Sequence, residues 1–461
     1  MSIAAASVWK PCDMRGIYPE AISEDLIRRV GAVIGSEMTP GSRIVVGGDF
    51  RLSTPPLKSA LIEGLISADL HVLDCGLAPT PLIYFHVAET QADGLAIVTA
   101  SHNPGEYNGL KWMVHGLPPS PEDITRIRNA AAERRIRTGK GSIEVADPEP
   151  AYRRWLLSRW RGLDAGAFGP LVVDAGNGAW SRLAPEILRE LGFEVECLFC
   201  EPDGRFPNRA PDCARTANLA ALRAAVVRSG ARLGIAWDGD GDRAAFVDEG
   251  GMHVSTDAIS LMLARSVLRD AEPGEAVICD IKLSDAVRRE VLRLGGVPIL
   301  ERSGHAFMRT RLLVERALLG LDACGHFFFR EAGSRDDGLY SALYLIDMLG
   351  GDGSLARLRE STSPQFTTPE LRIPAAVLDY GEVVDRLRQA FAGADELAID
   401  GARLVMNDGI VLARESSTEP VVSLRVEAFS EAGYQNLVAR CLTSLCEAQE
   451  LLLRQIRDSA G

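Results

Sequence analysis

One pattern of apolar strand, amphipathic helix and second apolar strand occurs three times in this sequence. The copies span residues 43–75, 171–199 and 276–300. In each, an aspartate stands near the end of the first strand, and Gly192 and Gly295 end the helices of the later two, as left-handed helix stops do. This alternation predicts parallel strands joined by crossover helices, with helices near 57–68, 185–191 and 285–294.

The copies start roughly a hundred residues apart, far beyond the ~20–50-residue periods of solenoids, so they indicate related domains. A chain of 461 residues is also too long for one core. We expect an α/β fold with three related α/β domains with mixed sheets and a smaller C-terminal α+β domain. That last domain follows a linker at 361–369, has strands near 410–413 and 421–426, and closes with one helix over about 434–457. The expected domains are 1–148, 149–252, 253–363 and 364–461.

The formal net charge of -13 disfavours nucleic acid and anionic membranes as partners, because the long-range field repels both. The first residues do not resemble a signal peptide, and the sequence contains no apolar run of the ~18 residues that a membrane helix needs. The nine cysteines are odd in number and scattered. We therefore expect a cytoplasmic protein with reduced, mostly buried thiols.

A first candidate site is a loop that follows the apolar run 94–100. It reads Ser101-His102-Asn103-Pro104, and a lysine, Lys111, follows shortly after. A serine needs a base or a metal to act as a nucleophile or phosphoryl carrier, and the lysine can neutralise phosphate. Alone, such a serine–histidine pair is more commonly a solvated turn, so this interpretation needs support from elsewhere in the chain.

The second candidate is an aspartate loop between two apolar strands, with Asp238, Asp240 and Asp242 separated by glycines. Three carboxylates so close repel one another unless a cation neutralises them, and oxygen ligands favour Mg²⁺ or Ca²⁺ over zinc. An EF-hand loop would need glycine at its sixth position, where Arg243 stands, although Glu249 supplies an acid at its twelfth. A solvated acidic turn is the remaining alternative. The pattern predicts a metal site.

A third candidate is a turn-like anion loop that combines a guanidinium with three hydroxyls, the chemistry that holds a phosphate: Arg414, Ser416, Ser417 and Thr418. An exposed polar turn is its alternative. Three loop residues, Lys282, His305 and His326, are ambiguous by themselves.

Together these motifs resemble the α-D-phosphohexomutase family, especially its bacterial phosphomannomutase/phosphoglucomutase branch. The resemblance covers essentially the whole chain. It rests on motifs at residues 13–16, 99–104, 107–111, 173–178, 202–208, 238–243 and 414–420.

The resemblance implies four domains around a central cleft, and Ser101 as a carrier of a phosphoryl group that shares Mg²⁺ with Asp238, Asp240 and Asp242. The phosphoserine would convert a hexose 1- or 6-phosphate, of mannose or glucose, into a hexose 1,6-bisphosphate, which serves as intermediate and activator. Catalytic roles would fall to Arg15, His102, Lys111 and His326. Substrate would contact Arg243, Lys282, His305, Asp322, Cys324, Arg414, Ser416, Ser417 and Thr418.

The sequence departs from the family pattern in the sugar-recognition loop, which usually reads Gly-Glu-x-Ser-Gly-His. Here Asp322 and Cys324 take the glutamate and serine positions, and a thiol is a weaker hydrogen-bonding group than a hydroxyl. A second departure is Cys12, where an aromatic residue commonly stands. These changes keep three alternatives open: a phosphoglucosamine mutase, a Mg²⁺-dependent sugar phosphatase, or a non-catalytic sugar-phosphate-binding relative. We expect small sugar phosphates as ligands and a monomer or dimer.

Overall fold

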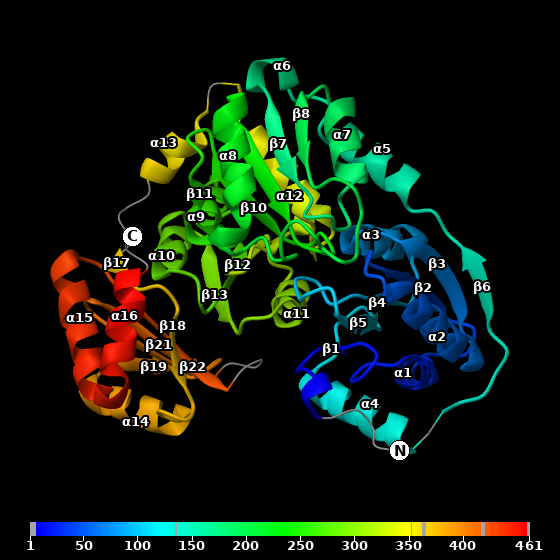
Figure 1. The fold of residues 1–461 in the computed structure, drawn as a ribbon, viewed down its shortest axis with the longest axis horizontal. Helices are drawn as coiled ribbons and strands as arrows, with labels where there is room; N and C mark the ends of the chain where they lie inside the picture. Colours follow the sequence, from blue (N-terminus) through cyan, green and yellow to red (C-terminus); the bar gives the residue numbers. More distant parts are fainter. Residues whose placement is uncertain (1–5, 134–135, 352, 362–365, 416–419, 459–461) are drawn as a thin grey trace.

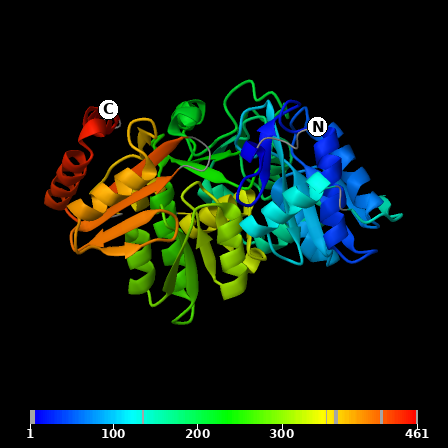
Figure 2. The ribbon, with the colours of Figure 1, turned by 90° about the horizontal axis from the view of Figure 1, so that it is seen from below.

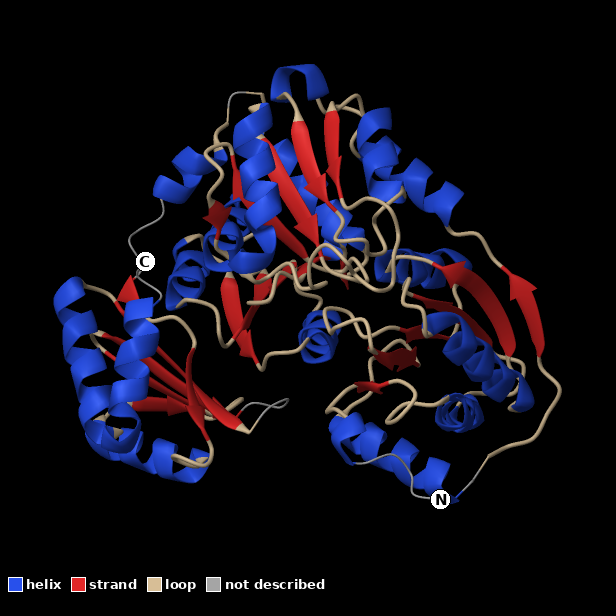
Figure 3. Cartoon of the chain, in the orientation of Figure 1, coloured by secondary structure: helices blue, strands red, loops and turns tan. Residues whose placement is uncertain are grey.

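A computed structural model describes residues 6–133, 136–351, 353–361, 366–415 and 420–458. Its strands form four sheets, one in each of four successive groups of elements (Figures 1 and 3). The predicted α/β class is confirmed. Among the described residues, no helix has the length and apolarity to cross a membrane.

The first sheet has the strand order β1-β5-β4-β2-β3-β6. Its centre is parallel, as the repeat predicts, because β2 pairs in parallel with both β3 and β4, while β5 runs antiparallel to β4 and β1. The elements are β1 (Met14–Ile17), α1 (Glu24–Glu37), β2 (Arg43–Gly48), α2 (Thr54–Ser67), β3 (His71–Leu77), α3 (Thr80–Thr90), β4 (Gly94–Val98), β5 (Tyr107–Val114), α4 (Pro121–Glu133) and β6 (Ser142–Val145).

The second sheet has the order β11-β10-β9-β7-β8, with β7 parallel to β8 and β9 and an antiparallel hairpin of β9 and β10. Gly192 stops α7 with φ 95°, as predicted. The elements are α5 (Glu149–Arg159), α6 (Ala165–Phe168), β7 (Leu171–Asp174), α7 (Leu183–Glu190), β8 (Val195–Leu198), α8 (Ala220–Ser229), β9 (Leu233–Trp237), β10 (Ala244–Asp248) and β11 (His253–Val254).

The third sheet has the order β13-β12-β14-β15-β16 and again a parallel centre. Helix α10 is capped by the Ser284 side chain and is followed by Gly295 at φ 81°. The elements are α9 (Thr256–Arg269), β12 (Ala276–Asp280), α10 (Asp285–Arg293), β13 (Val297–Glu301), α11 (His305–Glu315), β14 (Leu319–Leu321), β15 (Phe327–Phe329), β16 (Arg335–Asp336), α12 (Gly338–Leu349) and α13 (Leu355–Glu360).

The fourth sheet is antiparallel, with β17-β22-β21-β20-β19 in line and β18 also on β22. The single closing helix expected at 434–457 is wrong, because α15 and α16 are separated by a 3-10 turn at Cys446–Ala448. Part of the expected linker is also strand, namely β17. The elements are β17 (Phe366–Thr367), β18 (Leu371–Pro374), α14 (Tyr380–Ala390), β19 (Asp395–Leu397), β20 (Ala402–Met406), β21 (Gly409–Glu415), β22 (Val421–Ala428), α15 (Glu431–Ser444) and α16 (Gln449–Asp458).

The first three groups share one continuous core, which includes Leu73, Trp180 and Leu343 from the three groups in turn. The fourth group has a core of its own, and its elements lie together at one end of the ribbon (Figure 2). It contacts the third group through polar pairs, in which Arg425 lies 2.7 Å from Asp257. The first three groups therefore hold their loops in a fixed relation, whereas the fourth is joined mainly by charged contacts.

All nine cysteines are described, and all are free thiols. Only Cys75, Cys213, Cys279 and Cys441 are buried, so the expectation of mostly buried thiols is wrong for the other five.

Candidate active site

Ser101 lies in a tight turn directly after β4. Its backbone is left-handed, with φ 51°, and its N–H donates to the Thr99 hydroxyl over 2.9 Å. The Arg51 guanidinium donates to the carbonyl oxygens of Ser101 and Asn103 at 2.7 and 2.6 Å. Because a non-glycine residue rarely takes this conformation, these contacts are what fix the loop.

The aspartate loop connects β9 to β10 and meets this serine. Asp238 Oδ1 accepts the backbone N–H groups of Gly241 and Arg243, and its Oδ2 accepts the Ser101 hydroxyl at 2.8 Å. Gly241 has φ 84°, which a side chain would disfavour. The loop is thus built to aim Asp238 at the serine of the neighbouring group.

The three carboxylates form a cluster that fits a hard cation. One carboxylate oxygen from each of Asp238, Asp240 and Asp242 lies within 4.8 Å of the others. Oδ1 of Asp240 and Oδ1 of Asp242 are buried without a hydrogen-bond partner. Unpaired buried oxygens are costly unless a ligand satisfies them, and a cation supplies what they lack.

Lys111 closes one side of this cluster. Its ammonium donates to Asp240 at 2.8 Å and to Asp242 at 2.7 Å, and its side chain is only 4% exposed. Burial opposes the charged ammonium, but the two carboxylates outweigh it and raise the pKa of Lys111. Burial together with the other two carboxylates raises the pKa of Asp238. One lysine therefore offsets only part of the negative charge.

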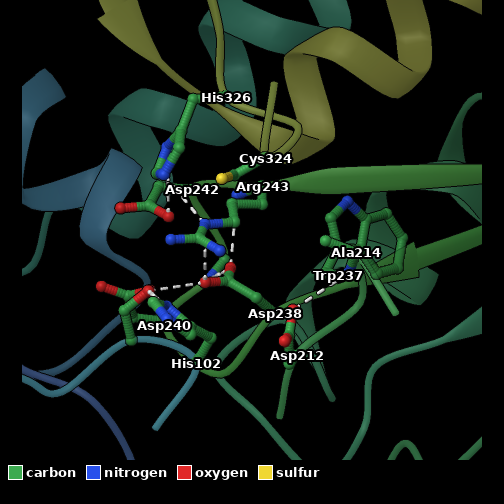
Figure 4. A network of polar contacts seen from close by, with 12 residues as sticks. His102, Asp212, Ala214, Trp237, Asp238, Asp240, Asp242, Arg243, Cys324 and His326 are labelled. Carbon is green, nitrogen blue, oxygen red and sulfur yellow. Dashed lines mark hydrogen bonds and ion pairs between the residues drawn. The ribbon is translucent and has the colours of Figure 1, made fainter. Parts of the chain in front are cut away.

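The third group brings His326 to the same place from the loop between β14 and β15 (Figure 4). Arg243 Nε donates to His326 Nε2 at 2.9 Å, and the two residues also form a β-bridge. Because Nε2 accepts this hydrogen bond, the ring proton is on Nδ1, which donates to the Asp336 carboxylate at 2.8 Å. Burial disfavours imidazolium, but Asp242 and the Asp336 bond raise the pKa of His326 overall.

Four further residues predicted to touch substrate line the third group's side. Lys282 Nζ lies 3.7 Å from the Cys324 sulfur. Asp322 Oδ1 accepts the Cys324 N–H, and the His305 ring lies 6.0 Å from the His326 ring, centroid to centroid. These side chains are therefore gathered beside Arg243.

Arg15 and His102 complete the surroundings of the serine. Arg15 is paired with Asp13 at 2.9 Å and donates to the Asn103 side chain. His102 Nδ1 lies 3.3 Å from the Ser101 hydroxyl oxygen. Burial, Arg243 and Arg15 hold the pKa of His102 well below its usual range, which makes it a neutral imidazole.

The anion loop is only partly described. Arg414, at the end of β21, donates to Asp400 at 2.9 Å. Ser416, Ser417 and Thr418 lie outside the described residues.

Five residues around the site escaped the sequence analysis. Thr80 and Thr99 both donate to Asp240 Oδ2, Asp336 holds His326, and Arg51 with its partner Asp49 holds the serine loop. The one available signal was the aspartate at the end of the first copy's strand, which is Asp49. The contacts of Thr80 and Thr99 with Asp240 left no local pattern, because the partners are 160 and 141 positions apart.

A serine, three carboxylates and a lysine from two α/β groups, completed by a histidine from a third, form a site with the groups that phosphoryl transfer needs. The relatives described next identify the enzyme as a phosphotransferase of the mutase type. Four domain models described as phosphoglucomutase/phosphomannomutase domains I, II, III and the C-terminal domain match residues 9–137, 165–251, 255–366 and 366–443. The chain belongs to the phosphoglucomutase/phosphomannomutase family.

Individual relatives agree with this assignment. A phosphomannomutase/phosphoglucomutase of Pseudomonas aeruginosa is 33% identical over 434 residues, 92% of either chain. A phosphoglucomutase of Neisseria gonorrhoeae is 32% identical and covers 95% of this chain and 97% of its own. A crystal structure of a Burkholderia thailandensis family protein superposes with a TM-score of 0.87, at 34% identity, over 96% of this chain and 98% of that one.

Proposed function

We propose that this enzyme interconverts hexose 1-phosphate and hexose 6-phosphate, of mannose or glucose, through phosphorylated Ser101 and a hexose 1,6-bisphosphate. The observation that carries the proposal is the 2.8 Å contact between the Ser101 hydroxyl and Asp238, inside a buried carboxylate cluster. This contact supports the proposal because a hydroxyl nucleophile needs a neighbouring cation to receive a phosphoryl group.

Asp238, Asp240 and Asp242, with Ser101, would hold Mg²⁺. When bound, that ion would neutralise charge on the transferring phosphoryl oxygens. The two unpaired carboxylate oxygens support this assignment. Lys111 would contribute a fixed positive charge from the opposite side of the cluster, because its ammonium already bridges two of the aspartates.

The protein's own residues would then position the sugar phosphate and move a proton. Arg243 would bind phosphate oxygens, and releasing His326 Nε2 to do so would free that nitrogen to take the attacking hydroxyl's proton. Asp336 keeps the ring oriented and stabilises the imidazolium that forms. Arg15 would offset charge at Ser101, and His102, as a neutral imidazole, would keep its hydrogen-bond contact with the Ser101 hydroxyl.

Recognition of the sugar and of its second phosphate would fall to the third and fourth groups. Lys282, His305, Asp322 and Cys324 would contact the sugar phosphate, and Arg414 with Ser416, Ser417 and Thr418 would bind the phosphate that is not reacting. The bisphosphate intermediate would turn over between the two transfers, so that either phosphate can return to Ser101.

The test is a substrate panel of hexose and hexosamine 1-phosphates, each run with its matching bisphosphate. We expect conversion of glucose and mannose phosphates, transfer of labelled phosphate from the bisphosphate to wild-type protein, and neither in Ser101→Ala. Ser142→Ala, an exposed serine on β6, is the matched control. Normal turnover of Ser101→Ala would refute the carrier role. Release of inorganic phosphate without isomer formation would instead show a phosphatase.

A further inference from the structure

A cavity of about 580 Å³ lies between the first and second groups, apart from the residues assigned to the site above. Three thiols line it: Cys75 from β3, Cys197 from β8 and Cys200 just beyond that strand. Cys75 is buried, whereas Cys197 and Cys200 are partly exposed. The proposed reaction uses none of them.

The backbone after β8 brings two of these thiols to one side. Residues three apart in an extended strand face opposite sides of a sheet. Here Phe199 interrupts the strand with φ 53°, and its carbonyl oxygen accepts the Asn177 N–H at 2.8 Å. The turn places Cys197 and Cys200 on the same cavity.

The two sulfurs have different surroundings. Arg189 Nη2 lies 3.0 Å from the Cys197 sulfur, so a cationic donor contacts the sulfur of this partly exposed thiol. The Cys200 thiol donates to the Leu198 carbonyl over 3.3 Å. Burial, the proximity of Cys197 and their mutual hydrogen bond raise the pKa of Cys200. The Cys197 sulfur therefore faces a cationic donor, whereas the Cys200 thiol keeps its proton on a backbone carbonyl.

We propose that Cys197 and Cys200 form a thiol–disulfide exchange site for a small disulfide. The Cys197 thiolate attacks one sulfur of that disulfide, its S–S bond breaks, and one small thiol leaves with a proton. Cys200 then loses its proton and attacks the Cys197 sulfur of the mixed disulfide, which releases the second small thiol. The protein dithiol loses two electrons and the small disulfide gains them.

Residues 201–206 connect Cys200 to a contact with the serine loop, so disulfide formation at Cys200 affects that loop. The Phe206 ring lies 5.0 Å from the Arg51 guanidinium, which in turn donates to the Ser101 carbonyl. Closing the disulfide changes the start of this segment and so lowers turnover. That second part rests on the proposed function, whereas the exchange itself does not.

The experiment treats the reduced full-length protein with oxidised glutathione and maps each thiol by mass spectrometry. Wild type should lose two hydrogen atoms at a Cys197–Cys200 disulfide. Cys200→Ser should instead retain one glutathione on Cys197, and Cys197→Ser should leave Cys200 as a thiol. Arg189→Gln should slow disulfide formation severalfold. The exposed Cys446 is the matched control and should carry a mixed disulfide in every variant.

A bridge from Cys75 to either partner, or glutathione persisting on Cys197 in wild type, would overturn the exchange site. For the second part, oxidised wild type should lose turnover severalfold and regain it with dithiothreitol, while Cys197→Ser keeps its turnover. Equal losses in wild type and Cys197→Ser would overturn regulation through this site. If neither form turns over, the mass spectra still decide the exchange, so the two failures are distinguishable.

Discussion

Replacing Arg51 by methionine removes the guanidinium that holds the serine loop while leaving a side chain of similar length. Arg51 is 1% exposed, and its partner Asp49, 2.9 Å away, is equally buried. The change also removes donors to the carbonyl oxygens of Ser101, Asn103, Pro104 and Tyr107. Breaking a buried ion pair by deleting one partner costs about 3–5 kcal/mol, because the remaining carboxylate loses its counter-charge.

For a folding unit of about 150–250 residues, that loss corresponds to a fall in Tm of about 6–20 °C. Differential scanning calorimetry of the full chain measures the fall in Tm as a shift of the first unfolding transition. Phosphoserine formation is measured on the same variants. The matched control is Arg205→Met. Arg205 forms an ion pair with Asp203, but its side chain is 72% exposed. That variant should barely change Tm, because exposed ion pairs contribute little.

A double variant isolates the cause. Asp49→Asn in the Arg51→Met background removes the unpaired charge while the two threonine donors, Thr54 and Thr99, stay in place. It should therefore recover part of the lost Tm. An unchanged Tm in Arg51→Met, or a further fall in the double variant, would refute the argument from the buried charge.

Three more outcomes follow from the contacts and burial of single residues. Cys324→Ser restores a hydroxyl beside Lys282 and should lower KM for hexose phosphates about fivefold, the worth of a ~1 kcal/mol hydrogen bond; a higher KM would contradict this. Chelation should abolish turnover, and added Mg²⁺ should restore it. The double variant Asp238→Asn, Asp240→Asn should lose turnover and its response to Mg²⁺. Activity that survives chelator would show the metal assignment to be wrong. Burial lowers the pKa of His253 from 6.5 to about 4, so the unfolded chain binds more protons in that window and stability rises with pH across it, by at most about 3 kcal/mol. His253→Gln should flatten this part of the urea-denaturation profile, and an identical slope would exclude His253 as its source.

The sequence predicted those parts of the fold whose cause is local. The strand at Ala276–Asp280 and the helix stops at Gly192 and Gly295 follow from apolar runs and from glycine's left-handed freedom. The break between α15 and α16 was missed because no glycine or proline marks it. Leu445 and Ala448 at the break are both buried in the fourth core, so tertiary packing decides its position.

The same division holds for the site. The aspartate loop was recognisable because three closely spaced carboxylates repel one another unless a cation neutralises them. Asp336 and Thr80 could not be recognised in this way. Each joins the site through a single side chain, Thr80 from the first group and Asp336 from the third. The sequence did not predict the preferred sugar, because Asp322 and Cys324 differ from the family pattern at the positions that contact it.

The site's dependence on several groups has a consequence for the growing chain on the ribosome. Ser101 and Asp238 are separated by 137 positions, which is roughly 7–30 s of synthesis at ~5–20 residues per second. During that interval the serine loop has emerged without the carboxylates that would bring a phosphoryl donor to it, and Lys111 remains hydrated. Under the proposed function, phosphorylation of Ser101 would become possible only after the second group has folded against the first, so a phosphorylated Ser101 would report that assembly has passed this point.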